Sequence, residues 1–215
     1  MPILKVQHDT AAAIALQLLK IEAIKLNTEK PFTWASGIKS PIYCDNRVSL
    51  SYPPVRSLIK ESLVNVIREN YPAVDSIAGV ATAGIPQGAL VADTLGLPFA
   101  YVRSSPKDHG LENLIEGRIN PQQKIVVVED LVSTGGSSLK AVEALRKAGA
   151  EVLGMVSIFT YGFDIAQSNF YNANVSLVSL SDFSHLLTVA VETGYITSNQ
   201  LVSLKAWRFD PSGWK

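Results

Sequence analysis

An acidic pair and a glycine-rich turn stand together near the middle of the chain, in the stretch KIVVVEDLVSTGGSSL over residues 124–139. The acids are Glu129 and Asp130, and the turn contains Gly135 and Gly136. The hydroxyl groups of the turn belong to Ser133, Thr134, Ser137 and Ser138. Glycine lets a ligand approach the backbone closely, and N–H groups at a helix start carry partial positive charge. The turn therefore predicts a cradle for a phosphate monoester.

Glu129 and Asp130 would repel a phosphate if they faced it, so we expect them to face a hydrogen-bond donor. The hydroxyls of a ribose are suitable donors, and Mg²⁺ is the competing ligand. The alternative is a plain helix cap with solvated acids, but a cap needs only one hydroxyl and no acid pair. The chain contains neither a G-x-G-x-x-G spacing nor a Gly-Lys-Ser/Thr turn, so the common nucleotide motifs are excluded.

The elements on either side of the turn are a strand and a helix. Residues 125–128 are four consecutive apolar β-branched residues, which is typical of a strand buried on both faces of a parallel sheet. Apolar residues then recur at helical spacing from Leu139 until Gly149 ends the run. The pattern places the acids at the tip of the strand and the turn at the helix start.

Strand and helix patterns alternate along the rest of the chain. This alternation predicts an α/β fold with an open, mostly parallel sheet flanked by helices. Further strands are predicted over residues 76–82, 99–103, 152–161 and 175–180. Further helices are predicted over residues 9–24, 53–71, 84–96, 163–172, 182–194 and 198–207. The expected N-caps are Asp9 or Thr10 for the first helix, Ser181 for the helix over residues 182–194, and Thr197 or Ser198 for the helix over residues 198–207.

The segment from residue 31 to residue 54 has a different character. Its prolines prevent a long helix, and its alternating residues predict a small subdomain of short hairpins laid over the main sheet. We therefore divide the chain into residues 1–52, with the first helix and this subdomain, and residues 53–215, a single α/β domain.

Composition limits the partners and the compartment. The 19 basic and 19 acidic residues give a net charge of zero, which argues against nucleic acid or an anionic membrane as a partner. The single cysteine, Cys44, excludes an internal disulfide and suits a reducing compartment. The N-terminus has no signal-peptide pattern, and the apolar run near it is too short to span a bilayer. We expect a soluble, cytoplasmic protein.

Two other stretches fall where strands are expected to end, the position where open parallel sheets bind ligands. Thr82, Ala83 and Gly84 could form a second anion cradle, although an ordinary strand-to-helix turn reads the same way. Residues 103–117 are long and polar, as expected of a mobile lid. Within this segment, Lys107, Asp108 and His109 form a charged triplet that is either simply solvated or clamps an anion on closure.

Three segments carry a family resemblance. VVVEDLVSTGGS resembles the phosphoribosyl pyrophosphate (PRPP) signature of type I phosphoribosyltransferases. RSSPKDHG resembles the catalytic loop of orotate phosphoribosyltransferases, and FTWASGIKSPIYCDNR resembles the segment that forms a hood over the base in that family. In one branch of the family a lysine stands at the position of Ala35, a Tyr-Lys pair at Thr82-Ala83 and another lysine at Ser104, so the chain resembles the other branch.

The resemblance implies the type I phosphoribosyltransferase fold and transfer of ribose 5-phosphate from PRPP to orotate. It implies catalytic roles for Lys107, Asp108 and His109. For PRPP it implies contacts from Arg103, Lys107, His109, Thr82, Ala83, Glu129, Asp130, Leu131, Val132, Ser133, Thr134, Gly135, Gly136 and Ser137. For orotate it implies Ser133, with Lys39 or Arg47 as the contact of the carboxylate.

The resemblance also implies Mg²⁺ held through PRPP and water, without direct protein ligands, and a homodimer in which each lid serves the neighbouring subunit. Two alternatives are a phosphoribosyltransferase for another base and a non-catalytic regulator that senses PRPP. The hood segment argues against the first. The Lys107-Asp108-His109 triplet and the absence of a basic excess argue against the second.

Overall fold

The computed structural model describes residues 4–34, 37–105 and 114–214. The strands of its main sheet are β1 (Leu4–Lys5), β6 (Ser76–Val80), β7 (Phe99–Val102), β8 (Ile115–Glu116), β9 (Lys124–Val132), β10 (Glu151–Thr160) and β11 (Leu177–Asp182). They lie in the order β1-β11-β10-β9-β6-β7-β8, and only β8 runs antiparallel to its neighbour. The predicted α/β class with an open, mostly parallel sheet is confirmed.

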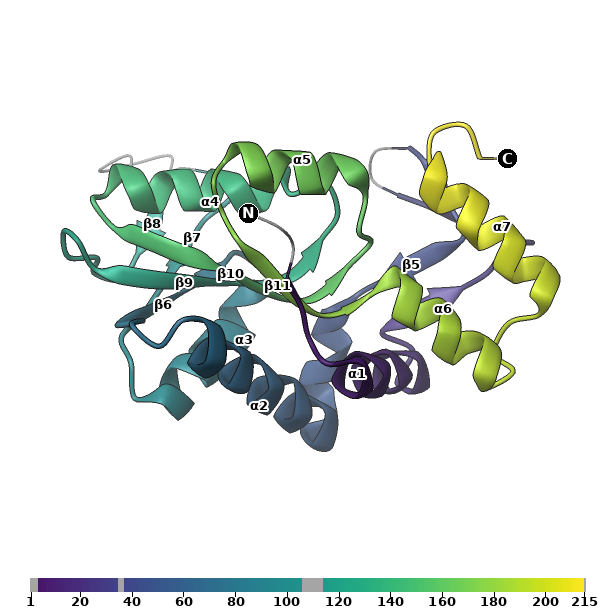
Figure 1. The fold of residues 1–215 in the computed structure, drawn as a ribbon, viewed down its shortest axis with the longest axis horizontal. Coiled ribbons are helices and arrows are strands. Elements are labelled where there is room, and N and C mark those ends of the chain that lie inside the picture. The colour runs from purple at the N-terminus through teal and green to yellow at the C-terminus, as the bar shows by residue number, and fades with distance from the viewer. Residues whose placement is uncertain (1–3, 35–36, 106–113, 215) are drawn as a thin grey trace.

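The helices of the described residues are α1 (His8–Lys20), α2 (Pro53–Asn70), α3 (Gly84–Leu95), α4 (Gly136–Lys147), α5 (Asp164–Asn172), α6 (Phe183–Glu192) and α7 (Ser198–Phe209). Five of them, α1 to α5, cover the two faces of this sheet. Helices α1, α2 and α3 lie below the sheet in Figure 1, and α4 and α5 lie above it. Successive residues of β9 supply the two resulting cores in turn: Val126 and Val128 join the lower one, and Ile125 and Val127 the upper one. This two-sided burial explains the apolar run at residues 125–128.

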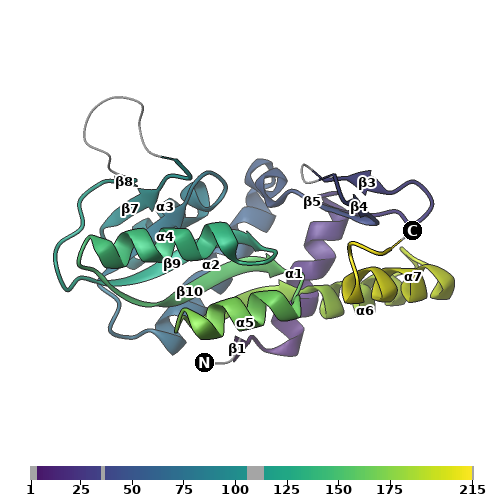
Figure 2. The ribbon, with the colours of Figure 1, turned by 90° about the horizontal axis from the view of Figure 1, so that it is seen from above.

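The N-terminal segment adds two small antiparallel hairpins, as predicted. Strand β2 (Ile24–Leu26) pairs with β5 (Ile42–Cys44), and β3 (Phe32–Thr33) pairs with β4 (Lys39–Ser40). A short 3₁₀ helix, η1 (Asn46–Ser51), follows them. We call residues 24–51 the hood. Strands β3, β4 and β5 lie at the same end of the molecule as α6 and α7 (Figure 2).

The division at residue 52 remains a prediction, and the segment before it is joined to the main domain. Strand β1 extends the main sheet by pairing with β11, and α1 packs against β11 and α6. An aromatic cluster joins the hood to the last helix, because the Trp34 ring lies 5.4 Å from that of Tyr161 and 5.6 Å from that of Trp207. The hood is thus packed on the C-terminal helices as well as on the sheet.

The first helix is shorter than predicted. Helix α1 ends at Lys20, and Ile24 begins β2 rather than continuing the helical stripe. The chain turns at Glu22, whose φ of 56° lies in the left-handed region. The predicted caps Asp9 and Thr10 are also wrong, because both residues lie inside the helix and Gln7 precedes it. Asp9 still places a negative charge in the first turn, where the helix dipole favours it.

Of the N-caps predicted for the last two helices, that of α6 is wrong and that of α7 is confirmed. The N-cap of α6 is Asp182 rather than Ser181, and its carboxylate accepts a hydrogen bond from the His185 N–H at 2.9 Å. Ser181 is buried one residue earlier, where its hydroxyl donates to the Ala11 carbonyl at 2.8 Å. Thr197 caps α7 in a reciprocal capping box with Gln200, as predicted. None of the helices in the described part of the chain combines the length and apolarity that a bilayer crossing requires.

Candidate functional site

The two acids lie within strand β9, two residues before it ends. Strand β9 continues through Glu129 and Asp130 to Val132, because its pairing with β10 extends to the pair Val132–Thr160. The acids thus stand near the end of the strand, as predicted, and the strand runs two residues past them. The strand fixes the backbone of both acids at the carboxyl end of the sheet, where open parallel sheets bind ligands.

Glu129 is buried, and its carboxyl group faces α4. The Ser138 hydroxyl donates to Glu129 Oε2 at 2.8 Å, and the Asp130 N–H donates to Oε1 at 3.0 Å. Ser138, expected among the phosphate donors, is therefore turned toward the acid and is itself only 2% exposed. The hydrogen bond from Ser138 ties the first turn of α4 to the strand that carries the acids.

Burial and mutual repulsion change the protonation of the pair. Burial raises the pKa of Glu129 to about 8, and the neighbouring Asp130 charge adds to this. Burial also raises the pKa of Asp130, while a hydrogen bond from Glu129 acts in the opposite direction. Both shifts favour the neutral form of a carboxyl group, so the pair tends to retain a proton near neutral pH. A pair with one charge repels a phosphorylated ligand less than a pair with two.

The turn after β9 is held in a shape that only glycine allows at one position. Gly135 has a φ of +80°, and a Cβ there would lie 2.6 Å from Cε2 of Phe170. The Asn169 amide donates to the Thr134 carbonyl at 2.9 Å, and the Thr160 hydroxyl donates to the Val132 carbonyl at 3.0 Å. Helix α4 then begins at residue 136, so its first N–H groups belong to the turn. This geometry suits an anion of phosphate size.

The side chains of Leu131 and Val132 are turned into the protein, so only the backbone of these residues could contact a ligand. The Val132 side chain is fully buried, and Leu131 packs against the lower core. The sheet therefore uses both side chains for packing, and only their peptide groups remain for a ligand.

A second turn lies beside the first, on the neighbouring strand. Strand β6 pairs with β9 up to the pair Gly79–Val128, and α3 starts at Gly84. A Cβ on Gly84 would lie 2.5 Å from the Val128 carbonyl oxygen and 3.4 Å from the Glu129 Cα. The turn with Thr82 and Ala83 is therefore packed against the acid-bearing strand, and the peptide bond from Ala81 to Thr82 is cis.

Arg103 follows the next strand, β7. The Ala81 N–H donates to the Val102 carbonyl at 2.8 Å, so Arg103 follows at the same end of the sheet. Its guanidinium lies 3.7 Å from Oε1 of Glu116, and its side chain is 31% exposed. The predicted lid residues Lys107, Asp108 and His109 lie outside the described residues.

The hood reaches the acids through Asn46. Its amide donates to the Asp130 carbonyl oxygen at 2.8 Å. Next to it, Arg47 forms a two-pronged ion pair with Asp45, with distances of 2.7 and 2.9 Å. Lys39 is exposed on β4 and donates to the Thr33 hydroxyl at 2.8 Å. Of the two predicted carboxylate contacts, Arg47 therefore belongs to the part of the hood that touches the acid strand.

A cavity of about 940 Å³ opens between the hood, the turn after β9 and the C-terminal helices. Ser133 and Thr134 line it on the turn side, and Trp34 and Ile38 line it on the hood side. Its size is that of a small-molecule site. Within the described ranges, no group of three or more His, Cys, Asp or Glu side chains could hold a metal ion.

The structure thus brings most of the predicted site residues to one end of three adjacent strands, β7, β6 and β9. These residues are Thr82, Ala83, Arg103 and residues 129–137. Lys39 stands apart on the hood. The sequence analysis missed Asn46 and Asn169, which hold two carbonyl groups of the central segment. Single asparagines in loops give no sequence signal that separates such a role from a surface position.

Comparison with known proteins identifies the family. Residues 52–184 match the phosphoribosyl transferase domain. An orotate phosphoribosyltransferase of Cytophaga hutchinsonii is 60% identical over 202 residues, which are 94% of this chain and 97% of the relative. The chain belongs to the orotate phosphoribosyltransferase family.

Other relatives extend this result within the orotate phosphoribosyltransferase family. The Streptococcus agalactiae serotype Ia protein of that name is 55% identical over 96% of this chain and 99% of its own length. The crystal structure of the Aeropyrum pernix orotate phosphoribosyltransferase matches with a TM-score of 0.72 and 29% identity, over 86% of this chain and 99% of that one. A Leishmania donovani UMP synthase matches with a TM-score of 0.78 and 27% identity, over 93% of this chain and 42% of that one.

Proposed function

We propose that this chain transfers ribose 5-phosphate from PRPP to orotate, giving orotidine 5′-monophosphate and pyrophosphate in pyrimidine biosynthesis. The observation that supports this most directly is the geometry of β9 and the turn that follows it. A charged carboxyl group, a phosphate-sized turn and a second helix start lie side by side at the carboxyl end of the sheet. PRPP carries a ribose, a 5′-phosphate and a pyrophosphate, one for each of these features.

Different residues bind the different parts of PRPP. The turn of residues 133–137 binds the 5′-phosphate through backbone N–H groups and hydroxyls. Asp130 faces the ribose hydroxyls, since the Glu129 carboxyl is already occupied by Ser138. Thr82 and Ala83, with the start of α3, bind the pyrophosphate. Departure of pyrophosphate leaves positive charge on the ribose, and the negative charge of Asp130 stabilises that charge.

Orotate binds between the hood and the turn after β9. The 940 Å³ cavity there offers the Ser133 hydroxyl on one wall and the Trp34 ring on another. Arg47 or Lys39 supplies the positive charge for the carboxylate of orotate. Of these two side chains, Arg47 is the closer candidate, because its positive charge acts on Asp130 and slightly lowers the pKa of that carboxyl group.

Mg²⁺ fits this site as an ion carried by the substrate. The carboxyl groups at the turn are a single pair that shares a proton, which is too few for the cage of oxygen ligands that Mg²⁺ needs from a protein alone. The ion would be held through PRPP oxygens and water, without a direct protein ligand. When bound, the ion neutralises charge on the pyrophosphate.

The lid triplet completes the proposal. Lys107 and His109, together with Arg103, neutralise the leaving pyrophosphate, and Asp108 belongs to the same catalytic segment. We propose a cytoplasmic homodimer in which this segment serves the neighbouring subunit. Lys107→Ala should lower kcat about 100-fold, the scale of losing one preorganised charge contact. Mixing this variant with Asp130→Asn should restore part of the activity through hybrid dimers, and no recovery would mean that each site uses one chain only.

The decisive experiment for the reaction is the absorbance change of orotate when the protein is mixed with PRPP and Mg²⁺. We expect turnover that requires all three components. Adenine, guanine, hypoxanthine and uracil serve as competing bases under the same conditions. Turnover of one of these in place of orotate would assign another base, and PRPP binding without turnover of any base would indicate a regulator.

A further inference from the structure

Asn46 is buried at the junction between the hood and the main sheet. It is only 1% exposed, and its amide donates to the carbonyl oxygen of Asp130, 84 positions along the chain, at 2.8 Å. Its side-chain oxygen faces the Cys44 thiol at 3.6 Å, and its own carbonyl accepts a hydrogen bond from Ser49 at 2.6 Å. These contacts hold Asn46 in one orientation.

The sheet itself explains why Asp130 needs this donor. The pairing of β6 with β9 stops at Val128, whereas the pairing of β10 with β9 continues to Val132. Beyond Val128, β9 therefore has a strand neighbour on the β10 side alone. A carbonyl group left without a ladder partner in a buried place is costly, and the Asn46 amide takes the position that a strand would fill.

Asn169 makes the corresponding contact with the turn that follows β9. It lies on α5, and its amide donates to the Thr134 carbonyl at 2.9 Å. Two asparagines from separate elements thus hold two carbonyl groups four residues apart. One belongs to the charged acid, and the other belongs to the turn after β9.

We propose that Asn46 is a positioning residue for the reaction, which acts by fixing the backbone of Asp130 and so the placement of its carboxylate against the ribose. Asn169 is its counterpart, which fixes the turn that binds the 5′-phosphate. This inference rests on the proposed function. Small displacements of a group that acts in the transition state lower kcat, whereas a loosened binding turn weakens substrate binding.

The test compares two matched substitutions in the full-length protein. Asn46→Leu and Asn169→Leu each keep the branched shape of the side chain and remove one amide donor. Steady-state kcat and KM are measured for PRPP and orotate. We expect Asn46→Leu to lower kcat about 10- to 100-fold with little change in the KM for PRPP. We expect Asn169→Leu to raise the KM for PRPP about 10-fold with kcat largely retained, as for a lost hydrogen bond that acts in binding.

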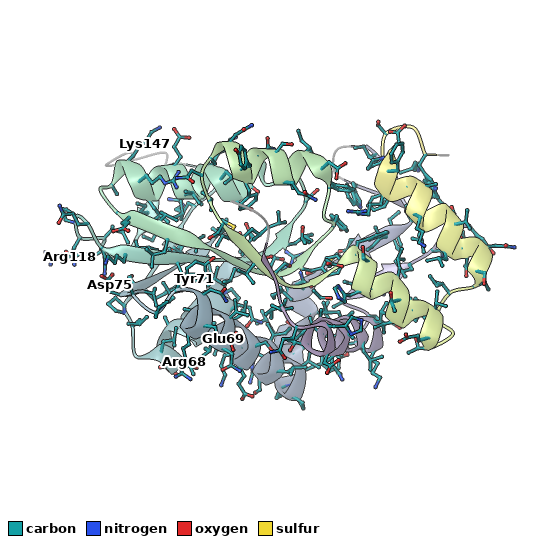
Figure 3. All side chains as sticks on the ribbon, in the orientation of Figure 1. Arg68, Glu69, Tyr71, Asp75, Arg118 and Lys147 are labelled. Carbon is teal, nitrogen blue, oxygen red and sulfur yellow. The ribbon has the colours of Figure 1, made fainter. Side chains whose placement is uncertain are left out.

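Asn70→Leu is the control. The Asn70 amide also donates to a backbone carbonyl, that of Val66 at 2.9 Å, but in α2. Its neighbours Glu69 and Tyr71 lie at the opposite end of the sheet from the site (Figure 3). We expect unchanged kcat and KM in this variant.

A second variant, Asn46→Asp, keeps the shape of the side chain while its ionised carboxylate cannot donate, so it should lose kcat as well. All variants are assayed below the unfolding transition measured for each. The proposal is overturned if a folded Asn46 variant retains kcat within twofold, or if the Asn46 and Asn169 variants change the same kinetic parameter to the same extent. An inactive wild-type protein would instead refute the proposed function.

Discussion

The turns after β9 and β6 have the same backbone arrangement. Both follow a buried strand, both lead into a helix, and both depend on a glycine without room for a side chain. They differ in their side chains. The β9 turn follows two acids and carries three hydroxyl groups at residues 133–137, whereas the β6 turn carries the Thr82 hydroxyl alone. The β9 turn can therefore recognise a sugar and its phosphate, while the β6 turn offers mainly backbone donors for an anion.

The two turns also differ in what holds them. The end of β9 is held by Asn46 of the hood, and the turn that follows it is held by Asn169 of α5. The β6 turn is fixed by backbone contact, since Gly84 rests against the Val128 carbonyl. Side-chain anchors can be removed one at a time with modest changes in packing. A backbone contact cannot be changed without moving a strand or a helix, so substitutions at the two turns should have different consequences.

The largest effect on activity should come from Asp130. Asp130→Asn keeps the size of the side chain and removes the negative charge next to the ribose, so kcat should fall about 1,000-fold, the upper range for one preorganised electrostatic contact. Thr82→Ala in the β6 turn should lower kcat/KM only a few-fold, because neighbouring N–H groups remain. Steady-state kinetics with orotate and PRPP measure both. Equal losses in the two variants would contradict the division of roles between the turns.

The next largest effect should be on stability, at the glycine of the β6 turn. Gly84→Ala would place a methyl group 2.5 Å from a backbone oxygen, so β9 and α3 must move apart. We expect a loss of about 3 kcal/mol in the free energy of unfolding, as for an overpacked core. Chemical denaturation followed by circular dichroism measures this loss.

Gly135→Ala is the matched comparison in the β9 turn. Its new methyl group meets the Phe170 ring, a side chain that can shift, and its φ of +80° disfavours alanine. The cost should be about 1–2 kcal/mol, the usual penalty for a left-handed residue that is not glycine. A larger loss at residue 135 than at residue 84 would contradict the distinction between side-chain and backbone anchors.

The sequence predicts the β9 segment well because its signals are local. Four apolar residues, two acids and a glycine turn depend on neighbours within a few positions. The length of the strand beyond Val128 has a tertiary cause. The apolar run is interrupted at Glu129, and the pairing with β6 ends at Val128, but hydrogen bonds to β10 continue to Val132. An apolar run in the sequence indicates which residues are buried, but it does not indicate how far two strands remain hydrogen-bonded.

The remaining errors have the same origin. Ser138 fits a phosphate cradle by sequence, yet the fold turns it toward Glu129. Ser181 is as good a cap as Asp182 by residue type, and the choice depends on which residue faces the helix start and which faces α1. Asn46 contacts a residue 84 positions away, so no local pattern reveals it. Contacts between distant segments decided each case.

The smallest expected effect concerns Glu129, and it is a change in the free energy of unfolding with pH. Its pKa is about 8 in the folded protein, against an ordinary value of 4.5. Between these two values the folded state binds more protons than the unfolded state, so the free energy of unfolding should fall as pH rises through this window. The slope for one proton is at most about 1.4 kcal/mol per pH unit.

Glu129→Gln keeps a neutral side chain that can still accept the hydrogen bond from Ser138. The variant should therefore lose most of the decline in stability with rising pH and exceed the wild-type stability at the alkaline end of the window. Urea denaturation at several pH values measures both proteins. A wild-type stability that stays level or rises from pH 5 to pH 8 would mean that Glu129 is ionised in the folded protein, and both acids would then face the ribose as charged groups.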